Sequence, residues 1–176
     1  MKKSMILCAL LATLILFSTN IYGKKNFITK VEVLGKSPSQ IYGFMFGLNK
    51  QKYLAWHEEH KDFKIVGQTK DTLGSVFFFH ERMDKLTVKY KWKVTSIVPN
   101  HKIVMKAEYF IPIYLTLIFD KTLNGTLVTH DLQVGTNPNS KILDWFVGTF
   151  ILTKSKQKSQ DRHAIEEFKN LEKLIQ

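Results

Sequence analysis

The C-terminal stretch "SQDRHAIEEFKNLEKLIQ" holds residues whose types and spacing suit metal chemistry. Helical periodicity, about 100° per residue, gathers its apolar side chains into one arc: Ala164, Phe168, Leu171, Leu174 and Ile175. Glu167 falls inside this arc, His163 lies one turn earlier at its margin, and Glu166 points away. Zinc takes imidazole and carboxylate ligands, and two residues four apart share a helical face. His163 and Glu167 therefore form a workable half-site for a metal ion.

Ordinary structural roles would also account for these two side chains. A glutamate on an apolar stripe can reach water or pair with a lysine, and a lone histidine beside a core is more often hydrogen-bonded than metal-bound. Both interpretations stay open from the helix alone.

The remaining ligands of such a site would have to come from strands or from other helices. In "GSVFFFHER", period-2 alternation puts Ser75, Phe77, Phe79 and Glu81 on one face and His80 on the other. Only one of His80 and Glu81 can therefore face the interior, and Glu81 can equally be a strand-end carboxylate near Arg82.

Three further histidines are candidates. His57 and His60 follow a short helical stretch and would lie on one side if that helix continued. His130 alternates with apolar neighbours in its strand, which indicates an inward core histidine and a reserve ligand.

The elements that would position these residues follow from turn and cap signals. "NFITKVEVLG" alternates as a half-buried strand, Ser37 with Pro38 begins a helix, and a second short helix runs to Trp56. Six strands are predicted next: 63–68, 74–82, 87–98, 102–109, 114–120 and 126–134. A long helix from 137–140 to the end closes the chain, with "KSKQKSQ" as an exposed part of it. The order predicts an α+β architecture with helices on one side of an antiparallel sheet.

This order resembles the helix-grip layout of the START-like (SRPBCC) superfamily over residues 26–176, which we expect to be a single domain. Three stretches resemble its diacetylphloroglucinol and phloretin hydrolase branch: "YLAWHEEH" (53–60), "GSVFFFHER" (74–82) and "RHAIEEFKNLEKLI" (162–175). The branch uses two histidines and two glutamates to hold zinc. The resemblance therefore implies the ligands His60, Glu81, His163 and Glu167, with His57 and His130 in reserve.

The resemblance also implies a curved sheet of about seven strands and a long helix over an apolar ligand cavity. Tyr90, Trp92, Tyr109 and Trp145 are the residues we expect to line it, and Tyr114 is a further cavity candidate. Two functions follow. One is zinc-dependent hydrolysis of a carbon–carbon bond in acylated phenolic compounds, and the other is metal-free carriage of a lipid or another small hydrophobic or aromatic molecule. Whether the protein is an enzyme stays open.

The first 23 residues predict a targeting segment. Lys2 and Lys3 precede an apolar run that is short for a membrane-spanning helix, and polar residues follow. Gly23 is the expected last residue before cleavage, although Ile21 departs from the small-residue rule, so an uncleaved anchor stays open. The single cysteine, Cys8, lies in this segment, and the remaining chain has no thiol for a disulfide. We expect an exported protein.

The net charge of +11 favours anionic partners or simply solubility. Predicted export and the near absence of arginine argue against nucleic acid and leave an anionic membrane surface as the candidate. "ILDWFVGTFIL" (142–152), apolar on nearly all sides, would be a membrane-facing cavity mouth or a buried segment under the short helices.

Overall fold

The computed structural model describes residues 25–67, 69, 72–83, 86–107, 113–134 and 153–176. The elements follow the predicted order: β1 (Lys25–Leu34), α2 (Pro38–Phe46), α3 (Lys50–Trp56), β2 (His60–Gly67), β3 (Val76–Met83), β4 (Leu86–Val98), β5 (Lys102–Ala107), β6 (Ile113–Lys121), β7 (Gly125–Val134) and α5 (Lys154–Leu174). The α+β class and the two short helices after the first strand are confirmed.

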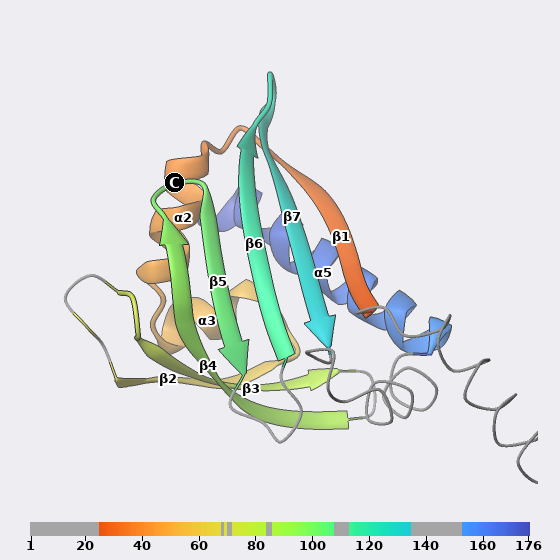
Figure 1. Ribbon diagram of the computed structural model, residues 1–176. Helices are drawn as coiled ribbons and strands as arrows, with labels where there is room; N and C mark the ends of the chain where they lie inside the picture. Colours follow the sequence, from red (N-terminus) through yellow and green to blue (C-terminus); the bar gives the residue numbers. More distant parts are fainter. Residues whose placement is uncertain (1–24, 68, 70–71, 84–85, 108–112, 135–152) are drawn as a thin grey trace, which may run out of the picture.

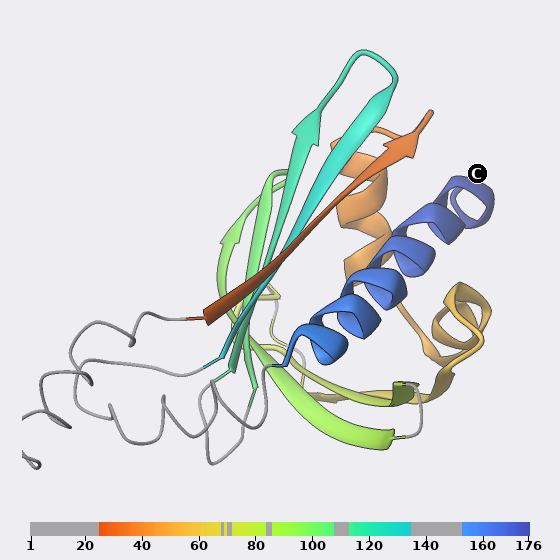
Figure 2. The same cartoon turned by 90° about the vertical axis from the view of Figure 1, so that its right-hand side faces the viewer.

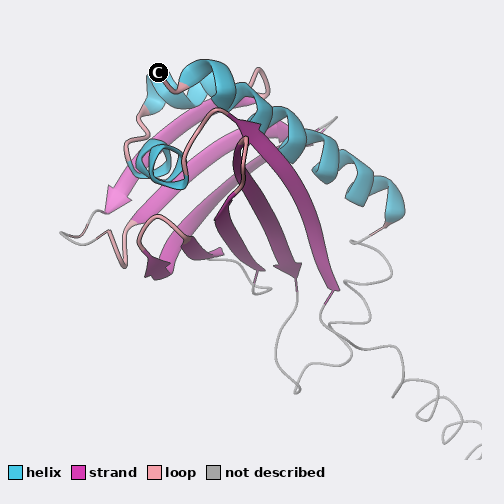
Figure 3. Cartoon of the chain, turned by 90° about the horizontal axis from the view of Figure 1, so that it is seen from above, coloured by secondary structure: helices cyan, strands magenta, loops and turns pink. Residues whose placement is uncertain are grey.

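One antiparallel sheet of seven strands forms the body of the protein, in the order β1-β7-β6-β5-β4-β3-β2 (Figure 1). The first strand returns to pair with the last, so β1 and β2 are the two edges. The three described helices lie on the same side of this sheet (Figures 2 and 3). That side is called the inner face below, and the opposite side is called the outer face.

Alternation along the strands decides which side chains meet the helices. In β4 and β5, Trp92, Val94, Ile103 and Met105 are buried on the inner face, while the residues between them are exposed or half-buried. The pairing of β4 with β5 shifts register between Val94 and Ser96, and an extra residue of this kind bends a strand. The sheet consequently curves around the inner core.

Each described helix begins at a side-chain cap. Ser37 forms a capping box with Gln40 at α2, and Asn49 caps α3. Thr153 has extended backbone angles and accepts a hydrogen bond from the Lys156 amide, so α5 begins at Lys154. The predicted helix from 137–140 to the end is therefore wrong in one respect, because it does not run through Thr153. Its earlier part, with the apolar segment 142–152, lies outside the described residues.

The turn between β6 and β7 requires glycine because β1 passes close to it. A Cβ atom added at Gly125 would lie 2.1 Å from the carbonyl oxygen of Val33. The predicted Asn124–Gly125 turn is thus confirmed, and the missing side chain lets β1 close against the β6–β7 hairpin.

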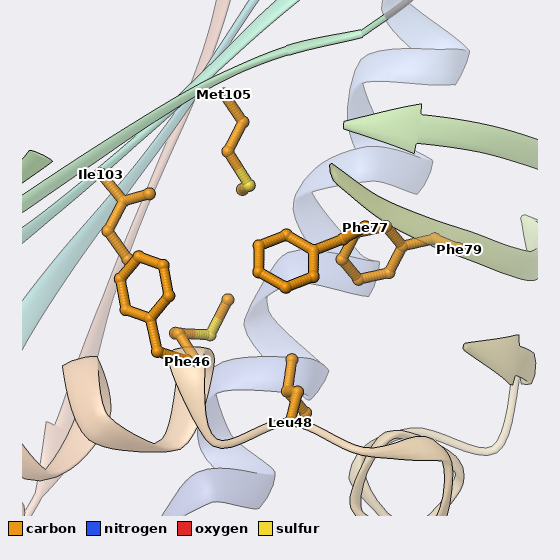
Figure 4. A pocket seen from close by; sticks show the side chains of 7 residues that line it. Phe46, Leu48, Phe77, Phe79, Ile103 and Met105 are labelled. Atoms are coloured by element: carbon orange, nitrogen blue, oxygen red, sulfur yellow. The ribbon is translucent and has the colours of Figure 1, made fainter. Parts of the chain in front are cut away.

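An apolar cavity lies between the end of α2 and the inner face (Figure 4). The side chains around it include Phe46, Leu48, Phe77, Phe79, Ile103 and Met105. Its volume of about 10 Å³ is room for about one water molecule. Among the described residues, no helix has the length and apolar character needed to cross a membrane.

Candidate functional site

Two histidines and two glutamates converge in the interior between the sheet and α5. One ligand atom from each of His60, Glu81, His163 and Glu167 lies within 4.8 Å of all the others. Glu167 Oε1 lies 2.7 Å from His60 Nε2 and 3.4 Å from His163 Nε2, and Glu81 Oε2 lies 3.7 Å and 3.8 Å from the same two nitrogens. All four residues are buried. The side chains chosen from the sequence therefore do meet.

Three elements supply these ligands. Glu81 follows Phe77 and Phe79 on the inner face of β3, as the alternation predicts, and His60 at the start of β2 is its direct cross-strand partner. The side chain of Glu167 is 12% exposed, whereas that of Glu166 is 51% exposed. The prediction that the two adjacent glutamates point in different directions is confirmed.

A pair of hydrogen bonds ties the end of α3 to α5 at the level of the site. The indole Nε1 of Trp56 donates to the carbonyl oxygen of Glu167 at 2.7 Å, and the Asn170 amide donates to the carbonyl oxygen of Trp56 at 3.0 Å. These bonds fix the helical turn that carries Glu167 against the segment that leads to His60.

The structure corrects the expectation that His57 and His60 share one side of a continuing helix. Helix α3 ends at Trp56 and strand β2 begins at His60. His57 therefore lies just after the helix, whereas His60 belongs to the strand. His57 Nε2 contacts Glu166 at 3.2 Å, and its Nδ1 accepts a hydrogen bond from the amide of Glu59. Both nitrogens of His57 thus have partners, although its ring packs 4.5 Å from that of His163.

Outer partners fix which nitrogen of each central histidine faces the site. His60 Nδ1 lies 2.7 Å from the carbonyl oxygen of Tyr53, and the two rings stack at 3.8 Å. His163 Nδ1 lies 3.2 Å from the carboxylate of Glu59. Both acceptors need a proton on Nδ1, and a metal-bound histidine is typically held by such a bond through its other nitrogen.

The lone pairs of the Nε2 atoms then meet carboxylate oxygens. With Nδ1 protonated, a neutral imidazole has only an acceptor at Nε2, and two acceptors at 2.7 Å repel unless a proton or a metal ion lies between them. His163 Nε2 is buried without a well-formed hydrogen bond to any described residue. The site therefore needs positive charge at its centre.

The pKa values of His163 and Glu167 also indicate that the site needs positive charge. Burial by itself lowers the pKa of His163, but the nearby carboxylates of Glu167 and Glu81 outweigh burial and raise this pKa to about 11. Burial by itself raises the pKa of Glu167, yet His163 and His60 hold it well below its usual value. Without a metal ion, protons on the histidines would supply the compensating charge.

The carboxylate of Glu81 is held by two tyrosine hydroxyls. Tyr53 donates to Oε2 at 2.9 Å, and Tyr90 donates to Oε1. Burial, and then the charges of Glu81 and Glu167, raise the pKa of Tyr53, so this hydroxyl remains a donor. Both tyrosines thereby orient Glu81 toward the histidines.

The predicted cavity residues fall in three places. Trp92 is buried in the inner core and Tyr90 is half-buried beside it, so both face the interior, and their contact with a ligand stays a prediction. Tyr109 and Trp145 lie outside the described residues. The proposal of Tyr114 as a cavity residue is wrong, because it lies on the outer face, where its ring is 5.9 Å from Lys106 Nζ.

His130, the second reserve ligand, faces inward on β7 as predicted but is not one of the clustered ligands. It is 6% exposed, its Nδ1 has no hydrogen-bond partner among the described residues, and burial lowers its pKa. A neutral histidine therefore stands in the interior near Phe168.

Two residues of the site were not predicted from the sequence. Tyr53 and Glu59 both lie in "YLAWHEEH", the stretch already noted for its histidines. Tyr53 is one helical turn before Trp56, which could have indicated a shared buried face. Glu59 stands in a turn between helix and strand, where no periodicity predicts direction.

Solved structures share this architecture at low sequence identity. The protein TTHA0849 from Thermus thermophilus is 16% identical, with a TM-score of 0.62 over 87% of this chain and 97% of its own. A START superfamily protein from Mycobacterium smegmatis is 14% identical, with a TM-score of 0.58 and the same coverage. Major latex-like protein 151 from Panax ginseng is 14% identical, with a TM-score of 0.53 over 80% of this chain and 97% of its own.

These likenesses show the fold of the chain, which is the helix-grip fold seen in START-like proteins. No protein-family model matches the sequence, and no curated protein matches it. The solved structures establish the fold, and the more specific resemblance to the hydrolase branch stays a prediction.

The raised pKa of His163 predicts a pH dependence for chelator-treated protein. The pKa of an unfolded histidine is about 6.5, whereas the pKa of His163 in the folded protein is raised to about 11. Its stabilising contribution is complete below the lower value and is lost as the pH rises through the higher one. The free energy of unfolding, measured in urea with chelator, should fall across this window relative to that of His163→Gln. His101→Gln, at an exposed turn, is the control, and a pH-independent difference for His163→Gln would contradict the assignment.

Proposed function

We propose that this protein binds zinc through His60, Glu81, His163 and Glu167 and holds a small hydrophobic or aromatic ligand in the interior beside the metal. The observation that supports the proposal most strongly is the convergence of four buried ligand atoms within 4.8 Å. The donor set of two imidazoles and two carboxylates is one that zinc accepts.

The spacing of the donors fits a four-coordinate ion. Ligands about 2.0–2.1 Å from zinc stand roughly 3.3 Å apart in a regular tetrahedron. The nitrogen–oxygen separations of 2.7, 3.4, 3.7 and 3.8 Å lie on both sides of that value. Small side-chain movements would therefore suffice for binding.

The charges also balance with a divalent ion. Two buried carboxylates carry two negative charges, and neutral histidines leave them uncompensated unless a cation of charge +2 is present. Because burying unpaired charge is costly, a zinc ion between these groups would stabilise the folded protein as well as the site.

The apolar part of the proposed site adjoins the metal ligands through one side chain. Phe79 borders the small cavity and is also in ring contact with Tyr53 and Tyr90, the two tyrosines that hold Glu81. The cavity has room for about one water molecule, so a ligand would have to displace the side chains around it, and Phe79 would form its aromatic wall toward the polar cluster. When bound, zinc would act there as a Lewis acid toward an oxygen of the ligand.

A second candidate function is hydrolysis of an acylated phenolic compound, and one observation favours it. The hydroxyls of Tyr53 and Tyr90 both donate to Glu81, so two O–H donors lie at the edge of the cluster. The pKa of Tyr53 is raised by burial, so we take the half-buried Tyr90 as the candidate that gives a proton to a substrate.

The proposed zinc site predicts different effects for two adjacent glutamates. Glu167→Gln should weaken zinc binding by more than about 100-fold, because it removes a ligand and its charge. Loss of a residue that is only hydrogen-bonded to a ligand costs about 10–100-fold. Glu166→Gln should have little effect, because the side chain of Glu166 is exposed and its carboxylate contacts His57 rather than the four proposed ligands. Competition with a fluorescent chelator, on protein purified without a nickel column, measures both affinities. Equal losses would contradict the assignment.

Glu59 should act as the outer partner that orients His163. Its replacement by alanine removes the acceptor at His163 Nδ1 and should weaken zinc binding by about 10–100-fold. Glu59→Gln, which keeps an oxygen acceptor, should recover part of the loss. The matched control is Glu58→Ala at the exposed neighbouring position. The role would be refuted if Glu58→Ala and Glu59→Ala had the same affinity.

If the protein is a hydrolase, Tyr90→Phe should lower kcat of the zinc-loaded protein on an acylated phenol roughly a hundredfold, because it removes the proton donor. Tyr114→Phe is the control, since that hydroxyl lies on the outer face. Both variants should be assayed at saturating zinc, because loss of the Tyr90 hydroxyl from Glu81 also weakens metal binding. Full activity in Tyr90→Phe would remove this candidate.

A further inference from the structure

The outer face of strands β2 to β5 concentrates basic residues on one half of the sheet. It faces away from the helices (Figure 2). Alternation places seven basic side chains there: Lys64, Arg82, Lys89, Lys91, Lys93, Lys102 and Lys106. Asp62 is the one carboxylate of these strands on that face among the described residues, and Lys50 and Lys64 already pair with it. The surface defined by these seven residues, the basic face, therefore has a strong excess of positive charge.

The arrangement works against the stability of the sheet. Lys93 and Lys106 are directly opposite each other in the pairing of β4 with β5, and like charges in such positions are destabilising. Lys89, Lys91 and Lys93 follow at every second residue of β4, about 6–7 Å apart. That spacing is below the Debye length of about 8 Å in physiological salt, so the charges repel one another and their potentials add outside the sheet.

Aromatic side chains lie between the lysines of the basic face. In the register of three neighbouring strands, Phe78 stands between Lys64 and Lys91, and Lys64 Nζ is 6.0 Å from its ring centroid. Tyr114 of β6 borders the face beside Lys106. Both rings are half-buried. Lysines with aromatic rings at their base suit the boundary between lipid headgroups and acyl chains.

We propose that the basic face docks on an anionic membrane surface and binds the phosphate groups of its lipids. Charge complementarity favours an anionic surface as the partner. The basic face has seven cationic side chains and, among the described residues of the same strands, one carboxylate. A bilayer is an extended anionic surface, which matches a charge pattern spread over four strands. Docking here leaves the inner face and its metal ligands unobstructed, so the surface is independent of the proposed zinc site.

Sedimentation of the full chain with lipid vesicles tests the docking surface. Vesicles of phosphatidylcholine alone measure charge-independent binding, including any by residues 1–23, and vesicles that also contain phosphatidylglycerol add the charge-dependent part. The variant Lys91→Gln/Lys93→Gln/Lys106→Gln should lose roughly fivefold in the charge-dependent affinity per lysine, and hence roughly a hundredfold in all. Its urea midpoint should be equal to or above that of the wild type, because like-charge repulsion is removed.

The control is Lys52→Gln/Lys158→Gln/Lys173→Gln, which removes the same net charge from exposed positions on α3 and α5. It should retain nearly all of the charge-dependent binding, and high salt should abolish that binding in the wild type. Equal losses in the two triple variants would overturn the proposal, because net charge alone would then explain the effect. Binding to a single-stranded oligonucleotide without charge-dependent vesicle binding would overturn it as well.

Discussion

Two carboxylates buried against two imidazoles are the constraint on which the interior of this protein depends. A buried carboxylate is tolerable only with hydrogen bonds and opposite charge. Glu167 lies on the apolar arc of α5 and Glu81 on the apolar face of β3, so each carries its charge into the core. His60 and His163 meet them there. The helix, the strand and the turn before β2 must therefore be placed together for any one of the four side chains to be stable.

Contacts around the site hold these elements and side chains in position. Tyr53 stacks on His60, accepts a hydrogen bond from His60 Nδ1 at its backbone carbonyl, and donates a hydrogen bond from its hydroxyl to Glu81. Trp56 binds the backbone of Glu167. A single short helix thus contributes to the orientation of three of the four ligands. Such convergence of outer partners on ligand atoms is typical of metal centres.

The parts of the site that lie on regular elements could be predicted from the sequence. Helical periodicity separated Glu167 from its neighbour, because a helix has a fixed rotation per residue. Strand alternation showed that only one of His80 and Glu81 faces inward, and the family resemblance chose Glu81. His60 came from family resemblance, and the sequence interpretation misplaced its backbone, since a turn replaces the helix after Trp56. Tyr53 and Glu59 were missed because their roles arise only from tertiary contacts. The seven-strand fold itself followed from caps, turns and alternation.

Native mass spectrometry of the protein isolated from its own cells tests the central claim most directly. The account predicts a folded chain whose mass includes one zinc ion, together with loss of that increment after treatment with a chelator and its return when zinc is added. A folded chain that carries no metal ion and gains none when zinc is supplied would contradict the account. The four buried side chains would then form a purely ionic cluster with protonated histidines.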